Sequence, residues 1–279
     1  MLLDADAYGA LDATYDPGPL ESAGNADALR LQLRVDEKAA FLAPLLAGLG
    51  PKAQARVLDI GCGQGGMLLA ARDLGCRAKG VEPSRDHSRI ARDTFGLDVV
   101  TGYFESAALL PERFDLVILS HVIEHVYRPA AFLEDVMRVV DAGGLLVVVT
   151  PNAAGMAARL CGRWWTMLKP HDHVSMMTPD GLRRTCPSAA AVAVRRSEYP
   201  WEPLVALLQG LRDRWREGSA DGASPQTISA ATFGARMDRL RHAMWLLTAL
   251  SWPLHLFNRL AGTQACLVAE YRKRGEGAA

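Results

Sequence analysis

The sequence predicts an α/β fold in which a mostly parallel, doubly wound sheet is covered by helices on both faces. Three observations predict it. Short apolar segments alternate with helical ones, the first apolar segment runs into a glycine-rich turn, and the second ends in a carboxylate. Apolar segments of this length are typical of strands that are buried on both faces.

The expected elements follow in chain order. Strands are expected at about 56–60, 77–82, 98–101, 115–120 and 145–150, with helices at about 65–74, 85–95 and 130–140. A sixth strand is expected at 191–196 and a seventh at 264–271. About 65 residues separate these last two strands, far more than an ordinary connection needs. They include an apolar helix near 203–216 and a longer helical region at 233–261.

Four parts of the chain are predicted from this pattern. An irregular lead-in and an amphipathic helix at 26–47 occupy residues 1–50, and the α/β core occupies 51–199. A helical insert occupies 200–262, and the last strand and a tail occupy 263–279. The helix at 26–47, the segment 153–187 and the insert are expected to form a cap over the site.

The glycine-rich turn between residues 57 and 66 is the strongest local signal in the chain. Gly61, Gly63 and Gly66 satisfy G-x-G-x-x-G, a pattern that also suits a dinucleotide. Glycine reaches positive φ and lets the backbone approach a ligand closely, and the helix that follows directs its free N–H groups over the turn. Glu82 ends the next strand, where a carboxylate can accept two hydrogen bonds from ribose hydroxyls.

Four motifs in fixed order extend from residue 56 to about 152. They are LDIGCGQGG, GVEPS, FDLVILSHVIEHV and an AGG turn before LLVVVTPN. With them the chain resembles the class I S-adenosylmethionine-dependent methyltransferases, in particular the branch with ubiquinone-biosynthesis and glycan-cluster enzymes. The resemblance implies a Rossmann-like, seven-stranded sheet whose antiparallel last strand inserts between the fifth and sixth, and S-adenosylmethionine as cofactor.

The same resemblance implies a set of cofactor-binding residues. It assigns residues of the glycine turn to the methionine end of the cofactor, the end of the second strand to the ribose, the segment after the third strand to the adenine, and the end of the fourth strand to the sulfonium. The residues are Asp59, Gly61, Cys62, Gly63, Glu82, Pro83, Phe104, Glu105, Ser120 and His121.

A hydroxyl acceptor must lose a proton as it is methylated, and histidine is the side chain best suited to accept it near neutral pH. Four of the seven histidines follow the expected fourth and fifth strands: His121, His125, His171 and His173. The candidates for catalysis are His125, His173 and His121. A structural role suits His125 equally well, and His171 is expected to be solvated.

The resemblance also raises the question of a divalent metal ion. In quinone O-methyltransferases of this branch, residues that follow the fourth strand have been linked to such an ion. The corresponding residues here are His121, Glu124 and His125, which a helix would place on one face. His121 stands where the family has a carboxylate, which disfavours an oxygen-preferring ion such as magnesium. No metal is expected.

The predicted reaction is O-methylation of a sugar or another small hydroxylated metabolite, a phenol or a lipid-linked glycan among them. Three alternatives remain open. They are N- or C-methylation of a small metabolite, a non-catalytic protein that binds the cofactor, and an NAD-dependent oxidoreductase suggested by G-x-G-x-x-G and Glu82.

Composition agrees with a soluble enzyme in a reducing cytoplasm, and the usage of alanine and arginine indicates a bacterial genome rich in GC. A role in small-molecule biosynthesis is what the family resemblance implies. Lys and Arg number 31, equal to Asp and Glu, so no overall charge favours nucleic acid. The five cysteines form no C-x-x-C pair, and the N-terminus lacks the pattern of a signal peptide. The apolar run 243–257 is too short to span a bilayer. The helical region 233–261 is expected to be a lid, a homodimer interface or a peripheral contact with the inner membrane face.

Overall fold

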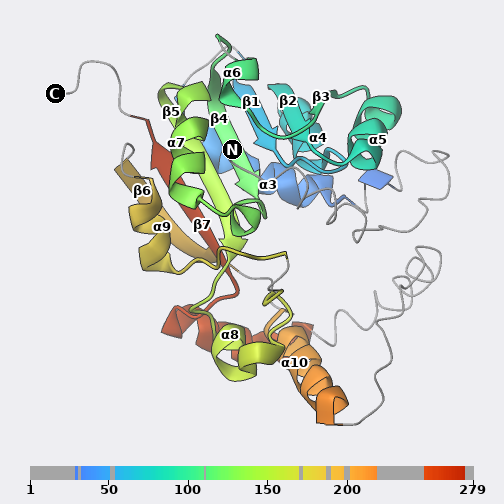
Figure 1. Cartoon of the computed structure of the whole chain (residues 1–279), viewed down its shortest axis with the longest axis vertical. Helices are drawn as coiled ribbons and strands as arrows, with labels where there is room; N and C mark the ends of the chain where they lie inside the picture. The colour runs from blue at the N-terminus through green and yellow to red at the C-terminus, as the bar shows by residue number, and fades with distance from the viewer. Residues whose placement is uncertain are drawn as a thin grey trace.

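The computed structural model describes residues 29–30, 33–50, 54–109, 111–169, 172–186, 190–197, 202–218 and 248–273 (Figure 1). Seven strands in these ranges form one sheet in the order β3-β2-β1-β4-β5-β7-β6. The strands are β1 (Arg56–Ile60), β2 (Arg77–Glu82), β3 (Asp98–Thr101), β4 (Phe114–Ser120), β5 (Val140–Pro151), β6 (Ala190–Ser197) and β7 (Cys266–Arg272). β7 lies antiparallel between β5 and β6, and the other neighbouring pairs are parallel. The predicted seven-stranded, mostly parallel sheet is therefore confirmed.

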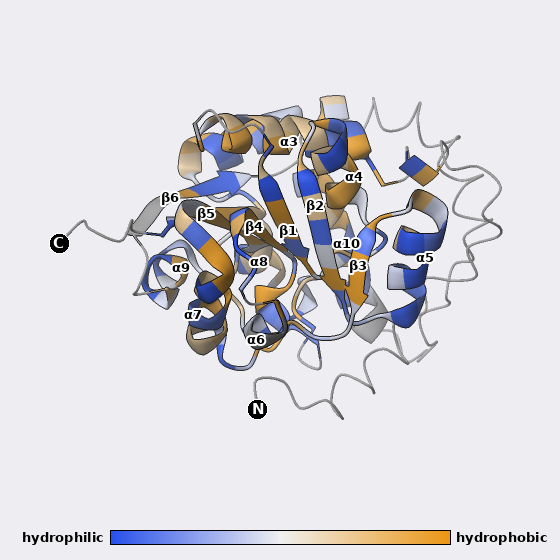
Figure 2. Cartoon of the chain, turned by 90° about the horizontal axis from the view of Figure 1, so that it is seen from above, coloured by the Kyte–Doolittle hydropathy of each residue, from blue (hydrophilic) through white to orange (hydrophobic). Residues whose placement is uncertain are grey.

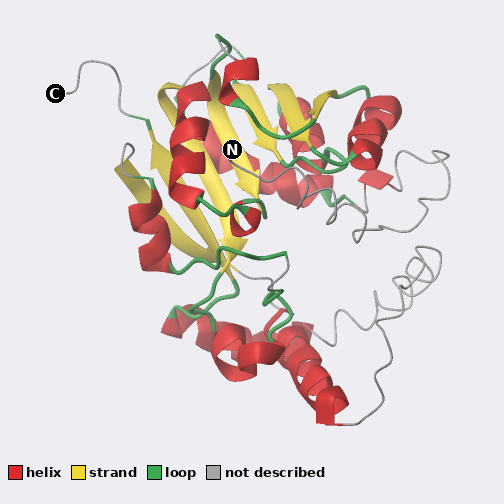
Figure 3. Cartoon of the chain, viewed as in Figure 1, coloured by secondary structure: helices red, strands yellow, loops and turns green. Residues whose placement is uncertain are grey.

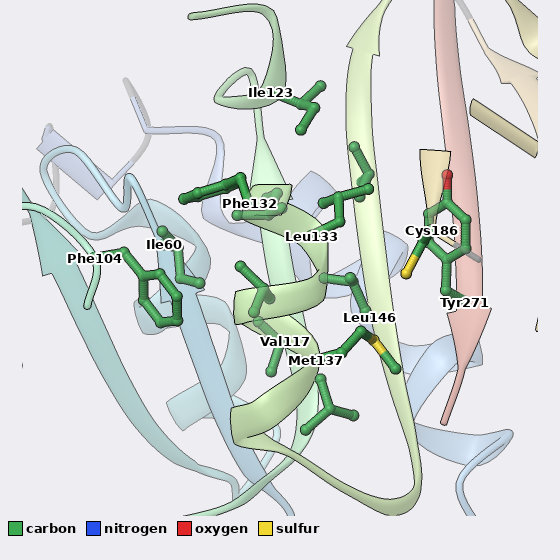
Figure 4. Close-up of a cluster of buried hydrophobic side chains, with 14 of the residues drawn as sticks. Ile60, Phe104, Val117, Ile123, Phe132, Leu133, Met137, Leu146, Cys186 and Tyr271 are labelled. Carbon is green, nitrogen blue, oxygen red and sulfur yellow. The ribbon is translucent and has the colours of Figure 1, made fainter. Parts of the chain in front are cut away.

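Helices cover both faces of the sheet, as the doubly wound pattern predicts (Figures 2 and 3). One face carries α3 (Val35–Ala47), α4 (Gly66–Asp73) and α5 (Arg85–Phe95). The other carries α6 (Ser106–Leu109), α7 (Pro129–Val139) and α9 (Pro179–Thr185). Successive strand residues alternate between the two, so Leu116 and Ile118 join the first core whereas Val117 and Leu119 join the second. Figure 4 shows the second core around α7.

A separate helical layer lies beyond the carboxyl ends of β4 and β5 (Figure 1). It contains α8 (Met156–Cys161), the 3-10 turn η2 (Gly162–Trp164), α10 (Glu202–Gly218) and the helix at 248–261. Cys161 and Trp165 are buried there beside α10. Of the predicted helix at 233–261, residues 233–247 lie outside the described part. The lead-in at 1–25 also lies outside it.

The largest differences from the sequence-based prediction concern α3, β5 and several short elements. A helix was expected at 26–47, but α3 begins at Val35, after a turn in which Arg34 has positive φ, and it packs beside α4 on one face of the sheet. β5 begins at Val140 rather than 145, because the turn 141–144 is drawn into the sheet by paired backbone hydrogen bonds between Lys273 and Gly143 and Gly144. Short helices α6, α8 and α9 and the 3-10 turns η1 (Ile123–His125) and η2 were not predicted. Segments of three to seven residues carry too few apolar positions to establish a helical period.

Gly80 supplies a test of how tightly β2 packs against the glycine turn. A Cβ at this position would lie 2.6 Å from the Sγ of Cys62 and 2.7 Å from a methyl of Leu68. We expect Gly80→Ala to lower the free energy of unfolding by about 1–3 kcal/mol, because a closely packed core resists an added methyl group. Urea unfolding followed by circular dichroism measures it. Gly48→Ala, whose new atom would meet only ordinary contacts, is the control; equal stability of the two variants would contradict the expectation.

Candidate functional site

The glycine turn after β1 forms the floor of the site. Gly61, Gly63 and Gly65 all have positive φ, at 74°, 54° and 86°, which L side chains rarely adopt. A Cβ on Gly61 would lie 2.5 Å from a methyl of Val122, whereas a Cβ on Gly63 would meet nothing within 4 Å. Gly63 therefore presents bare backbone to open space, which suits close approach by a ligand.

Glu82 ends β2 and binds the turn from beside it. Its carboxylate is buried and accepts hydrogen bonds from the backbone N–H groups of Gly63, at 2.7 Å, and Ser84, at 2.8 Å. β1 and β2 are adjacent parallel strands, which is why their carboxyl ends bring Glu82 and Gly63 together. The structure therefore places Glu82 beside the glycine turn, as the sequence predicts.

Asp59 is a buried carboxyl group with unused hydrogen-bonding capacity. Its side chain is 2% exposed, and its Oδ1 atom has no hydrogen-bond partner in the described part of the chain. Burial, followed by the nearby negative charge of Glu82, raises the pKa of Asp59 to about 8, and the charge of Lys38 opposes that rise. A buried polar atom without a partner is costly, so this atom is suited to a cationic or hydrogen-bonding ligand.

Cys62 is a packing residue of the turn. Its side chain is 7% exposed and faces Gly80. Burial raises the pKa of the thiol, and the charges of Asp59 and Glu82 raise it further. A thiol held protonated in this way is a poor nucleophile.

The predicted adenine-side residues are spread more widely. Pro83 follows Glu82 at the sheet edge, and Glu105 is exposed. The ring of Phe104 is directed into the core, edge-to-face with Phe132 at 5.9 Å between centroids (Figure 4). The contact of Phe104 and Glu105 with adenine stays a prediction.

A polar cluster follows β4. Ser120 is the last residue of that strand, and His121 has a positive φ of 57°, uncommon for a residue with a side chain. The Nδ1–H of His121 donates to Glu124, which also accepts from Thr150 at 3.0 Å. Burial would raise the pKa of Glu124, but the hydrogen bond and charge of His121, together with a backbone hydrogen bond and the charge of His125, hold that pKa below its ordinary value.

His125 is joined to the loop after β5 by Asp172. Its Nδ1 lies 2.8 Å from a carboxylate oxygen of Asp172 and 3.1 Å from that residue's carbonyl oxygen. Both partners are acceptors, so Nδ1 carries the hydrogen and Nε2 has the free lone pair. His173 lies edge-to-face on the His125 ring at 4.9 Å, and its Nδ1–H donates to the carbonyl oxygen of Met167 at 2.6 Å.

The structure therefore brings His121, His125 and His173 to one edge of the sheet, as predicted. His171 lies outside the described residues. Asp172 was missed as a site residue, although its place between two histidines in the sequence was a usable signal. Thr150 was missed because nothing in a buried strand distinguishes a threonine that binds a carboxylate from one that only packs.

One group of side chains has the spacing of a metal site. Ligand atoms of Glu124, His125 and His173 lie within 4.8 Å of one another, a set that differs from the trio weighed in the sequence because His173 replaces His121. These groups already hold hydrogen bonds to His121, Thr150, Asp172 and Met167. A metal would have to compete with those bonds.

The fold and the site together define a class. A sheet of this order, a glycine turn after β1 and carboxylates at the ends of β1 and β2 are the features of a Rossmann-like enzyme that binds a nucleoside-containing cofactor. A family model described as a methyltransferase domain matches residues 31–189, more than half of the chain. The chain belongs to this family and is a class I S-adenosylmethionine-dependent methyltransferase. This finding decides against an NAD-dependent oxidoreductase and against a non-catalytic protein.

Similar curated proteins carry a more specific name. The chain is 30% identical over 177 residues to the ubiquinone biosynthesis O-methyltransferase of Methylobacterium sp. (strain 4-46), a match that covers 60% of this chain and 71% of that protein. It is 30% identical over 172 residues to the protein of the same name from Chelativorans sp. (strain BNC1), covering 57% and 65%. The chain thus spans about two thirds of the length of these relatives.

Solved structures support the fold. A SAM-dependent methyltransferase from Archaeoglobus fulgidus superposes with a TM-score of 0.55 at 18% identity and covers 88% of this chain and 98% of its own. Coclaurine N-methyltransferase bound to N-methylheliamine and SAH superposes with a TM-score of 0.52 at 14% identity, covering 96% and 92%. At these identities the likeness concerns the fold alone.

Proposed function

We propose that the protein methylates a hydroxyl group of a small acceptor, a sugar or a phenol, and that His125 accepts the hydroxyl proton. The observation that carries the proposal is the pairing of His125 with Asp172 at the carboxyl edge of β4 and β5. The relatives named O-methyltransferase support oxygen as the methylated atom. Calorimetric titration with S-adenosylhomocysteine, followed by an acceptor screen of sugars and phenols, tests it.

The residues of the glycine turn fit the cofactor. The open backbone at Gly63 and the unpartnered oxygen of Asp59 suit the methionine end, with Asp59 facing its ammonium group. Glu82, buried at the end of β2, suits two ribose hydroxyls. Gly61 and Cys62 shape the turn, Pro83, Phe104 and Glu105 belong to the adenine side, and Ser120 and His121 border the place of transfer.

The chemistry divides between cofactor and protein. The bound cofactor supplies an electrophilic methyl group on a sulfonium. The protein orients the acceptor oxygen, excludes competing water and removes its proton. The Nε2 atom of His125 suits this last task because Nδ1 is held by Asp172, which keeps the ring in one tautomer. His173, whose Nδ1 is bonded to Met167, supports the ring of His125 from its edge.

Asp59 yields a prediction about proton release. Its pKa of about 8 keeps it mostly protonated at pH 7, whereas an ammonium group beside it favours the carboxylate. We expect S-adenosylhomocysteine to release up to about one proton on binding at pH 7, and less above pH 8, where the carboxyl is already ionised. Calorimetry in buffers of different ionisation enthalpy measures the release. Asp59→Asn should abolish it; equal release by both proteins would refute the assignment.

The expectations about the acceptor, the oligomeric state and the location of the protein are proposals as well. A lipid-linked glycan is proposed as a third class of acceptor. A homodimer, a cytoplasmic location and contact with the inner membrane face through 233–261 are likewise proposed. A helical cap over the acceptor is proposed from the place of α8, α10 and the helix 248–261 at the carboxyl edge (Figure 1).

A further inference from the structure

Loops run between the sheet and the helical layer (Figure 3), and three of them meet at Asn152. Asn152 follows β5 and is fully buried, at 0% exposed. It pairs in a parallel bridge with Met177, in the loop that leads to α9. Its backbone N–H donates to the carbonyl oxygen of Ala265, in the loop that leads to β7, at 2.8 Å. We call residues 152–156, 176–178 and 262–265 the junction.

The side chain of Asn152 forms hydrogen bonds in two directions. Its Nδ2–H donates to the carbonyl oxygen of Gln264 at 2.8 Å, and its Oδ1 accepts the backbone N–H of Ala154 at 3.0 Å. The bond to Ala154 is an Asx turn, which bends the chain toward α8. The bond to Gln264 ties that turn to the chain that returns to β7. A side-chain amide can make both bonds because it is a donor and an acceptor at once.

Close packing fixes the start of α8 at the junction. Gly155 precedes α8, and a Cβ there would lie 3.0 Å from the carbonyl oxygen of Asn152 and 3.1 Å from that of Gln264. The next residue, Met156, donates its N–H to the carbonyl oxygen of Thr263 at 2.8 Å. Backbone therefore lies directly against backbone, and α8 cannot shift unless these bonds break.

The junction also holds the loop that carries Asp172. This loop leaves the helical layer after Trp165, which is buried there beside α8. It reaches the sheet at Met177, whose carbonyl oxygen accepts the N–H of Ala153 at 2.9 Å. Because α8 and Met177 are both bonded at the junction, both ends of the loop depend on it.

We propose that Asn152 is a positioning residue for methyl transfer, which places the helical layer on the sheet and thereby holds Asp172 at His125. The inference rests on the proposed function of His125 and concerns the acceptor side of the site. The cofactor side is built separately, from the ends of β1 and β2 and the bond between Glu82 and Gly63. Loss of the Asn152 side chain should therefore lower turnover of the acceptor but leave cofactor binding intact.

Hydrogen–deuterium exchange of the full-length protein, without acceptor, tests the structural step. In Asn152→Ala we expect the amides of α8 to exchange about tenfold faster, because a buried side chain that makes two hydrogen bonds is lost. Exchange in β1 and β4 should stay unchanged. Gly155→Ala, which would press a methyl group on the same backbone, should have the same effect and serves if Asn152→Ala does not fold. The control is Tyr271→Phe, which removes one buried hydrogen bond, to Leu182, and should leave α8 unchanged.

Turnover and binding test the functional step. With an acceptor from the screen, Asn152→Ala should lower kcat/KM by about 10- to 100-fold, since a small misplacement of the reacting groups is costly. Its calorimetric affinity for S-adenosylhomocysteine should match that of the wild-type protein. Tyr271→Phe should retain both the turnover and the affinity.

Three outcomes would overturn the proposal. Normal exchange of α8 in both Asn152→Ala and Gly155→Ala would show that the junction does not place the layer. Faster exchange with normal kcat/KM would show that the place of the layer does not govern the acceptor side. An equal loss of affinity for S-adenosylhomocysteine would make Asn152 a general stabilising residue. Failure of the proposed function differs from all three, because His125→Ala would then keep its turnover while α8 in Asn152→Ala still exchanges faster.

Discussion

Replacing Glu82 by alanine is expected to weaken S-adenosylhomocysteine binding by roughly 10- to 100-fold. The buried carboxylate is proposed to accept two ribose hydroxyls, and charge-assisted hydrogen bonds of this kind contribute about 1.5–3 kcal/mol. A loss of about 1.4 kcal/mol corresponds to a tenfold change in affinity. Isothermal titration calorimetry of the wild-type and variant proteins measures the effect.

Glu82 also holds the backbone N–H of Gly63, so the variant needs a control for the shape of the turn. An S-adenosylhomocysteine analogue without the ribose 2′-hydroxyl separates the two effects. It should bind the wild-type protein more weakly, and Glu82→Ala should weaken it less than the parent ligand. Equal losses for both ligands would show that Glu82 acts only through the turn. Glu112→Ala, which removes an exposed partner of Lys79, should leave affinity unchanged.

Replacing His125 by alanine is expected to lower kcat by about 10²- to 10⁴-fold, the usual contribution of a general base. Affinity for S-adenosylhomocysteine should change little, because His125 is proposed to act on the acceptor rather than on the cofactor. The measurement is formation of S-adenosylhomocysteine with an acceptor found in the screen. It is compared with calorimetric binding of the same variant.

Two further variants distinguish a base from a structural histidine. Asp172→Asn keeps a hydrogen-bond acceptor but removes the charge that steadies His125, and should cause an intermediate loss of kcat. His173→Ala should lower kcat less than His125→Ala does, because the ring of His173 only packs against the edge of the His125 ring. A full loss in His173→Ala, with His125→Ala nearly active, would transfer the role of base to His173.

The fold could be predicted largely because its signals are local. The strands at 56–60, 77–82 and 98–101 match β1, β2 and β3, since each is a short apolar run closed by a turn or a charge. The bounds of an element were predicted less well where they depend on a segment that is distant in the sequence. The turn 141–144 joined β5 only because Lys273 pairs with it across the sheet.

The residues of the site also fall into two groups, those that the sequence predicts and those that only the structure brings together. The glycine turn and Glu82 were predictable because motif order places both at the carboxyl edge of adjacent strands. The pairing of His125 with Asp172 joins positions 47 residues apart, and its distance follows from the course of the loop after β5. The ring of Phe104 packs edge-to-face against Phe132, and its contact with adenine stays a prediction.

By itself, the sequence determined the order of the elements, and its resemblance to the methyltransferase family implied the antiparallel place of the last strand. The order of the elements follows from hydrophobic period and turn residues, which act over short stretches of chain. The tertiary structure alone decided which histidine is held by a carboxylate and which side of the helix 248–261 faces outward. Both depend on contacts between distant segments, because a helix or a ring takes its orientation from what it packs against.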